Sequence, residues 1–269
     1  MTAKNEKKPT VLIGYDRPRA LHPRWLRVNI CHQISNTRTS RALLPGRYLT
    51  QLIRGITLGA MNQVLTCPRC DSVVREPSIW TSSYHCEQHG DVHPLRSALS
   101  PSQEGLDGVL RGAHVPVWVP WPLPQGWLVT GFAACGDERT GTRGCSVALS
   151  GPNPVGEGPA EMMLISEEPG VGLGARFAGL GGTDPGVQFA SGPPAGAVEF
   201  GNHEFPVWNV ETKGRAAFAG EVSGYWLWLV LWPDIAGMLL VEPLPLRDLR
   251  DPGQDLDLPF GAPSPQLPG

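Results

Sequence analysis

The sequence predicts an α+β protein that is mostly β, with an antiparallel sheet in its larger domain. Its 33 glycines and 28 prolines are spread over 269 residues, as expected for many turns between short strands. The longest apolar run, residues 225–232, suits a strand that is buried on both faces. It is far shorter than the roughly 20 residues that a transmembrane helix requires.

Four residues have the spacing of a metal site. Cys67 and Cys70 form a C-x2-C pair, and Cys86 and His89 form a C-x2-H pair after fifteen intervening residues. Two such turns can each supply two ligands to one tetrahedral ion, which is typical of a small zinc ribbon. Because four protein ligands leave no open position, the predicted cofactor is a structural Zn²⁺.

The stretch between the two ligand pairs is compatible with this ribbon. Short strands are predicted at residues 72–75 and 78–85, separated at Pro77. His85 and His93 are near enough in sequence to replace His89 as the fourth ligand. The two-residue spacing favours His89, and Gly90 beside it provides the backbone freedom that such a turn uses.

Charge separates residues 1–60 from the rest of the chain. They carry 11 Lys and Arg against 2 Asp and Glu, a net charge of +9, whereas the remainder has a net charge of −12. A basic arm could bind nucleic acid or anionic lipid. However, residues 1–60 show no regular hydrophobic period, and Met61 stands just before the first ligand. We therefore expect a basic, irregular leader from a misassigned start, a zinc ribbon at 61–99, a β-rich domain at 100–250 and a Pro- and Gly-rich tail at 251–269.

The elements of the β-rich domain can be placed in order. Ser100 or Ser102 is expected to cap a brief helix that ends near Gly112. The proline-rich segment 116–122 suits an extended edge strand. Further strands are predicted at residues 127–134, 145–150, 161–166, 205–210, 216–222, 225–232 and 238–242. The strand at 225–232 should lie centrally, because both of its faces are apolar.

A glycine-rich loop at residues 170–179 follows the strand predicted at 161–166. Its amides could hold a phosphate. The candidate ligand-binding residues are Gly170, Gly172, Gly174, Arg176 and Glu168. The loop does not match GxGxxG, since Phe177 takes the third glycine position, and no lysine follows to complete GxxxxGK[ST]. The pattern therefore favours a sharp connection between a strand and a short helix.

The remaining candidates are aromatic residues and cysteines. Trp118 and Trp121 are predicted to form an exposed partner surface, because the surrounding prolines oppose burial in a central strand. Cys135 and Cys145 flank one predicted turn and could face each other. Three cysteines at zinc spacing indicate a reducing compartment, by default the cytoplasm, so core packing is expected rather than a disulfide. No Ser-His-Asp order, nucleophile elbow or HExxH is present, so no catalytic residue is assigned.

Four strings together resemble a family of actinobacterial proteins, the domain of unknown function 6758, typical of Streptomyces-like bacteria. They are CPRC at 67–70, VPVWVPWPLP at 115–124, EEPGVGLGARFAG at 167–179 and GYWLW at 224–228. The resemblance covers Met61 to the C-terminus and leaves out residues 1–60. Members of such families are sometimes labelled phosphotransacetylase, and the resemblance brings no catalytic residues.

These observations predict an interaction or regulatory protein with a structural zinc site, which binds a protein partner or a small ligand. The acidic charge of residues 61–269 argues against nucleic acid as the partner, and no membrane association is expected. The alternative is a phosphotransacetylase-like enzyme that transfers an acyl or phosphoryl group by means of loop 170–179.

Overall fold

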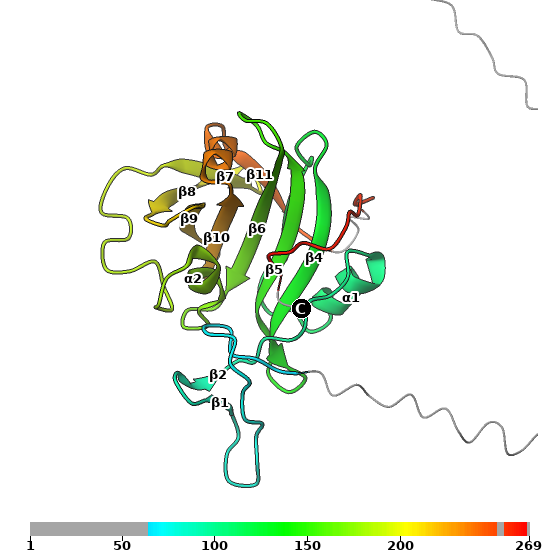
Figure 1. The fold of residues 1–269 in the computed structure, drawn as a ribbon, viewed down its shortest axis with the longest axis vertical. Helices are drawn as coiled ribbons and strands as arrows, with labels where there is room; N and C mark the ends of the chain where they lie inside the picture. The colour runs from blue at the N-terminus through cyan, green and yellow to red at the C-terminus, as the bar shows by residue number, and fades with distance from the viewer. Residues whose placement is uncertain (1–63, 252–255, 268–269) are drawn as a thin grey trace, which may run out of the picture. The chain divides into compact units, whose positions relative to one another are not determined.

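The structure is a computed structural model that describes residues 64–251 and 256–267 (Figure 1). The leader predicted at 1–60, with its misassigned start, lies outside the described residues. Within them, no helix has both the length and the apolar character needed to cross a membrane.

The main element of the fold is a curled nine-stranded sheet with the order β3-β11-β7-β8-β9-β10-β6-β5-β4. Its strands are β3 (Trp118–Pro120), β4 (Leu128–Asp137), β5 (Gly141–Pro152), β6 (Pro159–Glu167), β7 (Gly196–Phe200), β8 (His203–Val210), β9 (Ala216–Val222), β10 (Tyr225–Trp232) and β11 (Leu244–Asp248). Neighbouring strands are antiparallel except β7 and β11, which are parallel. The fold is therefore mostly β, as predicted, but the sheet is mixed rather than antiparallel.

Strand β10 separates two apolar cores. Leu227, Leu229 and Leu231 face one core, whereas Trp228 and Val230 face the other, and all five are buried. This alternation follows from the period of two along a strand. The strand lies between β9 and β6, so the predicted central position is confirmed.

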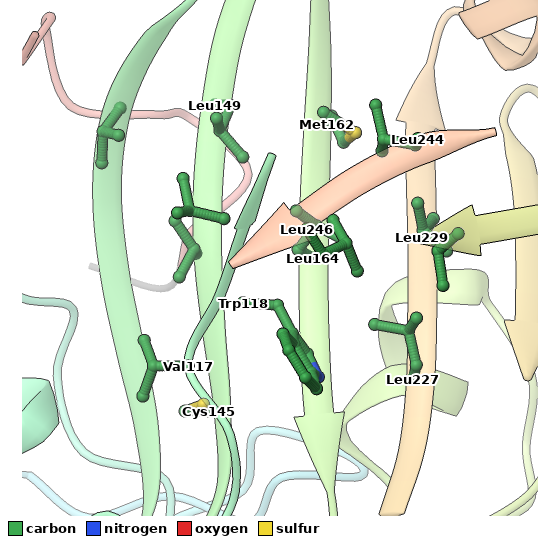
Figure 2. Packing of buried hydrophobic residues seen from close by; sticks show 14 of the residues in the cluster. Val117, Trp118, Cys145, Leu149, Met162, Leu164, Leu227, Leu229, Leu244 and Leu246 are labelled. Carbon is green, nitrogen blue, oxygen red and sulfur yellow. The ribbon is translucent and has the colours of Figure 1, made fainter. Parts of the chain in front are cut away.

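The first core is closed because the sheet curls over itself. Strands β3 and β11 cross the face formed by β5 and β6, and Figure 2 shows Trp118 and Leu246 lying over Leu164. The ring of Trp118 also meets Phe200 edge to face, with 4.6 Å between ring centroids. The segment predicted as an edge strand is indeed at one edge of the sheet, but its side chains enter the core.

The second core is covered by helix α2 (Leu173–Ala178). Leu173 and Phe177 are buried beside Trp228. Gly174 allows the helix to approach closely, since a Cβ at this position would lie 2.1 Å from Cδ1 of Trp228. The sharp connection and short helix predicted for loop 170–179 are thus present.

Helix α1 (Gln103–Leu110) has the predicted cap. The hydroxyl of Ser102 accepts a hydrogen bond from the amide of Gly105 at 3.1 Å. Leu106 and Val109 of this helix are buried in the first core.

Residues 234–240 differ from the prediction. They form the 3₁₀ helix η1 (Asp234–Leu240), where a strand was expected at 238–242. Ala236 and Leu240 are buried, whereas Ile235 and Met238 are exposed. The amide of Ala236 donates to the carbonyl of Pro233 at 2.9 Å, the i→i+3 bond of a 3₁₀ turn, and Pro233 provides the fixed backbone angle that starts such a turn.

Cys135 and Cys145 lie on opposite faces of the β4–β5 hairpin. In the register, Cys145 pairs with Ala134 and Cys135 pairs with Gly144. Cys145 accordingly lies in the first core and Cys135 in the second. The expected core packing is confirmed, and burial raises the pKa of the Cys145 thiol to about 12.

Residues 64–99 form few regular elements. The short strands β1 (Tyr84–Cys86) and β2 (Gly90–Val92) make a hairpin, and isolated bridges join Thr66 to Val73 and Arg75 to His85. Of the strand predicted at 78–85, only residues 84 and 85 are in a strand, as part of β1. Ser78 and Thr81 instead close a turn through their backbone and hydroxyl groups, which compete with strand pairing.

Candidate metal centre

The structure brings Cys67, Cys70, Cys86 and His89 together, so that their donor atoms all lie within 4.8 Å of one another. Nδ1 of His89 lies 3.5 Å from Sγ of Cys67 and 3.7 Å from Sγ of Cys86. The sulfurs of Cys70 and Cys86 are 3.7 Å apart. This cluster can hold a metal ion.

Two tight turns position these ligands. In the first, the amide of Asp71 donates to the carbonyl of Cys67 at 2.9 Å, and Asp71 has a positive φ of 67°. In the second, Cys86 pairs with Gly90 across the β1–β2 hairpin, and Gly90 has a φ of 70°. The backbone freedom predicted for Gly90 is therefore used.

The two alternative histidines lie outside the cluster. Nδ1 of His85 is 3.2 Å from a carboxylate oxygen of Asp91. His93 lines a separate cavity of about 260 Å³, and burial lowers the pKa of its imidazole, as does the charge of Arg143. The structure thus groups His89 with the cysteines, as the spacing predicted.

The thiols of the first turn differ in acidity. Burial raises the pKa of Cys67 to about 11. Burial also acts against ionisation of Cys70, but hydrogen bonds with the hydroxyl and amide of Ser72 outweigh it and lower the pKa to about 6. The hydrogen bonds from Ser72 thus favour the thiolate form of Cys70, which is the form that binds metals.

The first turn is attached to the glycine-rich loop. Arg69, inside the C-x2-C pair, donates from Nε to the carbonyl of Val171 at 3.2 Å and from Nη2 to the carbonyl of Gly170. Arg176 of α2 forms an ion pair with Asp71 at 3.1 Å. Two residues of the metal turn thus clamp residues 170–176, an arrangement that sequence reasoning missed.

The start of α2 holds a carboxylate of the protein itself. Oε2 of Glu167 accepts from the amide of Leu173 at 2.6 Å, and Oε1 accepts from the amide of Gly174 at 3.1 Å. Burial raises the pKa of Glu167 to about 7, and these hydrogen bonds oppose the rise. The amides of Leu173 and Gly174, two of those considered for a phosphate, are therefore already satisfied. Glu168, the predicted ligand residue, instead pairs with Arg143 at 2.7 Å.

The predicted tryptophan surface is wrong for Trp118, which is 2% exposed. Its strand lies at the edge of the sheet, yet the curl turns it into the first core. Trp121 is partly buried against the same core. Among the described residues, the aromatic residue that is exposed is Trp80, which sequence reasoning assigned to a strand; it is 87% exposed.

Together, the fold and the site define a mostly β protein with a Cys₃His cluster that can hold a metal ion. The chain belongs to the Family of unknown function (DUF6758), which matches residues 61–267. The expected resemblance is thus confirmed at the level of the family. No curated protein and no solved structure matches the chain.

Proposed function

We propose that the cluster binds one structural Zn²⁺ and that residues 64–99 form a zinc ribbon around it. With Zn–S bonds of about 2.3 Å and Zn–N bonds of about 2.0–2.1 Å, the ligand atoms of a tetrahedral site lie about 3.5–3.8 Å apart. The separations of 3.5 Å and 3.7 Å in the cluster agree with these values. Three cysteines and one histidine are a common ligand set of structural zinc.

We infer that the protein is an interaction or regulatory protein of a reducing compartment, by default the cytoplasm. The observation that carries this proposal is the clamp between the metal turn and residues 170–176. Arg69 and Asp71 have their side chains engaged with Gly170, Val171 and Arg176. A closed metal site that also fixes a neighbouring loop organises a surface, and it offers no open position for a substrate.

A phosphotransacetylase-like role has less support from the same residues. An anion at the start of α2 would have to displace the Glu167 carboxylate from the amides of Leu173 and Gly174. The cavity of about 260 Å³ beside the loop is lined by Glu168, whereas Arg176 is engaged with Asp71. An acetyl phosphate assay tests this alternative. Turnover that is lost in Arg176→Ala would contradict the interaction role.

Metal analysis of the full-length protein tests the zinc site. We expect one equivalent of zinc per chain, and we expect Cys67→Ser combined with Cys86→Ser to remove it. His89→Gln should weaken zinc binding, measured by competition with a chromophoric chelator. His85→Gln and His93→Gln serve as matched controls and should retain the wild-type affinity. Less than a tenth of an equivalent in the wild-type protein would refute the site.

A further inference from the structure

The region before Cys86 presents two large apolar side chains to solvent. Ile79 is 90% exposed and Trp80 is 87% exposed. They are carried on an ordered turn. The amide of Ser78 donates to the carbonyl of Thr81 at 2.9 Å, and the amide of Trp80 donates to the Ser78 hydroxyl at 3.2 Å. We call residues 77–83 the tip segment, and it contains no charged residue.

The tip segment is held at its base. Arg75 and His85 exchange backbone hydrogen bonds of 2.9 Å and 3.0 Å, and Arg139 of the β4–β5 turn donates to the carbonyl of Ser82. Cys86 of the metal cluster follows directly. Because hydrogen bonds already fix this backbone, the tip segment would lose little conformational entropy when a partner binds to it.

A groove of about 420 Å³ adjoins the tip segment. Its apolar lining is provided by Leu65, Pro77 and Tyr84, and its charged lining by Arg96, Asp137, Glu138 and Arg139. Three of these charges already have partners: Arg96 donates to Thr142 at 3.0 Å, Arg139 is engaged with Ser82, and Asp137 accepts from the amide and the hydroxyl of Thr140 at 2.6 Å and 2.8 Å. Among the described residues, the lining charge left without a partner is therefore Glu138, and Glu76 lies next to Pro77 of the lining. Burial raises the pKa of Tyr84. The negative charges of Asp137, Glu76 and Glu138 raise this pKa further, and the positive charge of Arg139 lowers it.

We propose that the tip segment and this groove bind a protein partner, through a partner segment that has an apolar anchor next to Lys or Arg side chains. Tryptophan is enriched among the hot spots of protein interfaces, and Trp80 is exposed beside the exposed Ile79. Glu138 at the groove and Glu76 beside it complement a basic segment and steer its approach. This inference rests on the proposed interaction role and names the surface that carries it.

Other occupants fit these observations less well. The net charge of −12 over residues 61–269 repels nucleic acid and anionic lipid. A second copy of the chain would bring Glu138 and Glu76 of one groove against the same carboxylates of the other, and like charges across an interface oppose association.

Photocrosslinking of the full chain in its source cells tests the surface. A photoreactive phenylalanine analogue replaces Ile79 in one variant and Val187, which is also exposed, in the control. We expect a protein adduct from position 79 and none from position 187. The crosslinked protein is then purified and titrated against three forms: wild type, Trp80→Ser and Val187→Ser.

The expected result has three parts. Trp80→Ser should weaken binding at least about tenfold, Val187→Ser should leave it unchanged, and added salt should weaken the wild-type complex, as basic partner residues require. Unfolding midpoints of the three forms should agree, since both side chains lie outside the core.

Several outcomes overturn the proposal. A purified partner that binds Trp80→Ser as tightly as wild type refutes the surface but leaves the interaction role intact. An adduct with nucleic acid or with a second copy of the chain refutes the partner class. The lack of any adduct at position 79, together with no partner in affinity capture, refutes both the surface and the interaction role.

Discussion

Glu167 places a carboxylate in the second core, beneath the first turn of α2. Its two oxygens accept hydrogen bonds from the amides of Leu173 and Gly174. One side chain thus satisfies two N–H groups that have no partner within the first turn of a helix. The arrangement has an electrostatic cost, because burial disfavours the ionised form. The pKa of Glu167 is consequently raised to about 7.

This raised pKa predicts how stability depends on pH. The unfolded chain releases the proton near pH 4.3, whereas the native state holds it until about pH 7. Between these values the native state binds more protons, so this group's contribution to stability falls as pH rises, by about 4 kcal/mol in total. Glu167→Gln removes the effect. The difference in unfolding free energy between Gln variant and wild type should grow in favour of the variant from pH 5 to pH 7.5.

Urea denaturation of both zinc-loaded proteins at each pH measures this difference. Other titrating groups, including the metal ligands, contribute equally to both proteins and cancel. A difference that is constant over this pH range would show that Glu167 is ionised in the native state throughout.

At the scale of elements, β3 and the tip segment carry tryptophans in opposite environments. Trp118 is 2% exposed and Trp80 is 87% exposed. Trp118→Ala should destabilise the protein by about 3–5 kcal/mol, the usual cost of truncating a buried aromatic residue. Trp80→Ala should change stability by less than about 0.5 kcal/mol. Chemical denaturation of the two variants provides the comparison, and equal losses would mean that β3 does not pack as described.

A second prediction at this scale concerns the clamp between the metal turn and α2. Arg69→Ala removes the donors to Gly170 and Val171, so amides of residues 171–176 should exchange faster with deuterium. Arg75→Ala is the matched control, since that side chain lies on the surface beside Glu87 at 3.9 Å. Hydrogen exchange followed by mass spectrometry resolves the loop. Equal protection in both variants would leave the clamp without an energetic role.

Signals that are local in sequence predicted part of this structure. The metal ligands, the Ser102 cap and the strand β10 could be predicted because each depends on the spacing of neighbouring residues. The burial of Trp118 could not, since it depends on how the whole sheet curls. The roles of Glu167 and Arg69 also escaped prediction. Glu167 caps a helix that starts six residues later in the chain, and Arg69 donates hydrogen bonds to residues 101 and 102 positions away.

At the scale of the whole molecule, the metal should order one part of the chain without supporting the rest. Structural zinc provides about 10–16 kcal/mol in small modules that fold only with metal. The nine-stranded sheet instead has two apolar cores of its own. Chelation should therefore abolish exchange protection between residues 66 and 92 and reduce it at 171–176, while protection in β5, β6 and β10 remains.

Hydrogen exchange before and after treatment with a chelator measures this pattern, and restored zinc should reverse it. Loss of protection throughout the sheet would show that the two parts fold as one cooperative unit. Unchanged protection of residues 66–92 would remove the case for a structural metal.

The edges of the large sheet limit how any partner can attach. Along the outer side of β4, backbone groups of Arg96, Leu99 and Gly261 bond to Ala134, Phe132 and Val129. At the opposite edge, β3 spans three residues and ends at Pro120, which has no amide hydrogen to donate. Extension of the sheet by an incoming strand is thereby disfavoured at both edges. A partner of the proposed kind would then be recognised through side chains, so that single substitutions could alter the specificity.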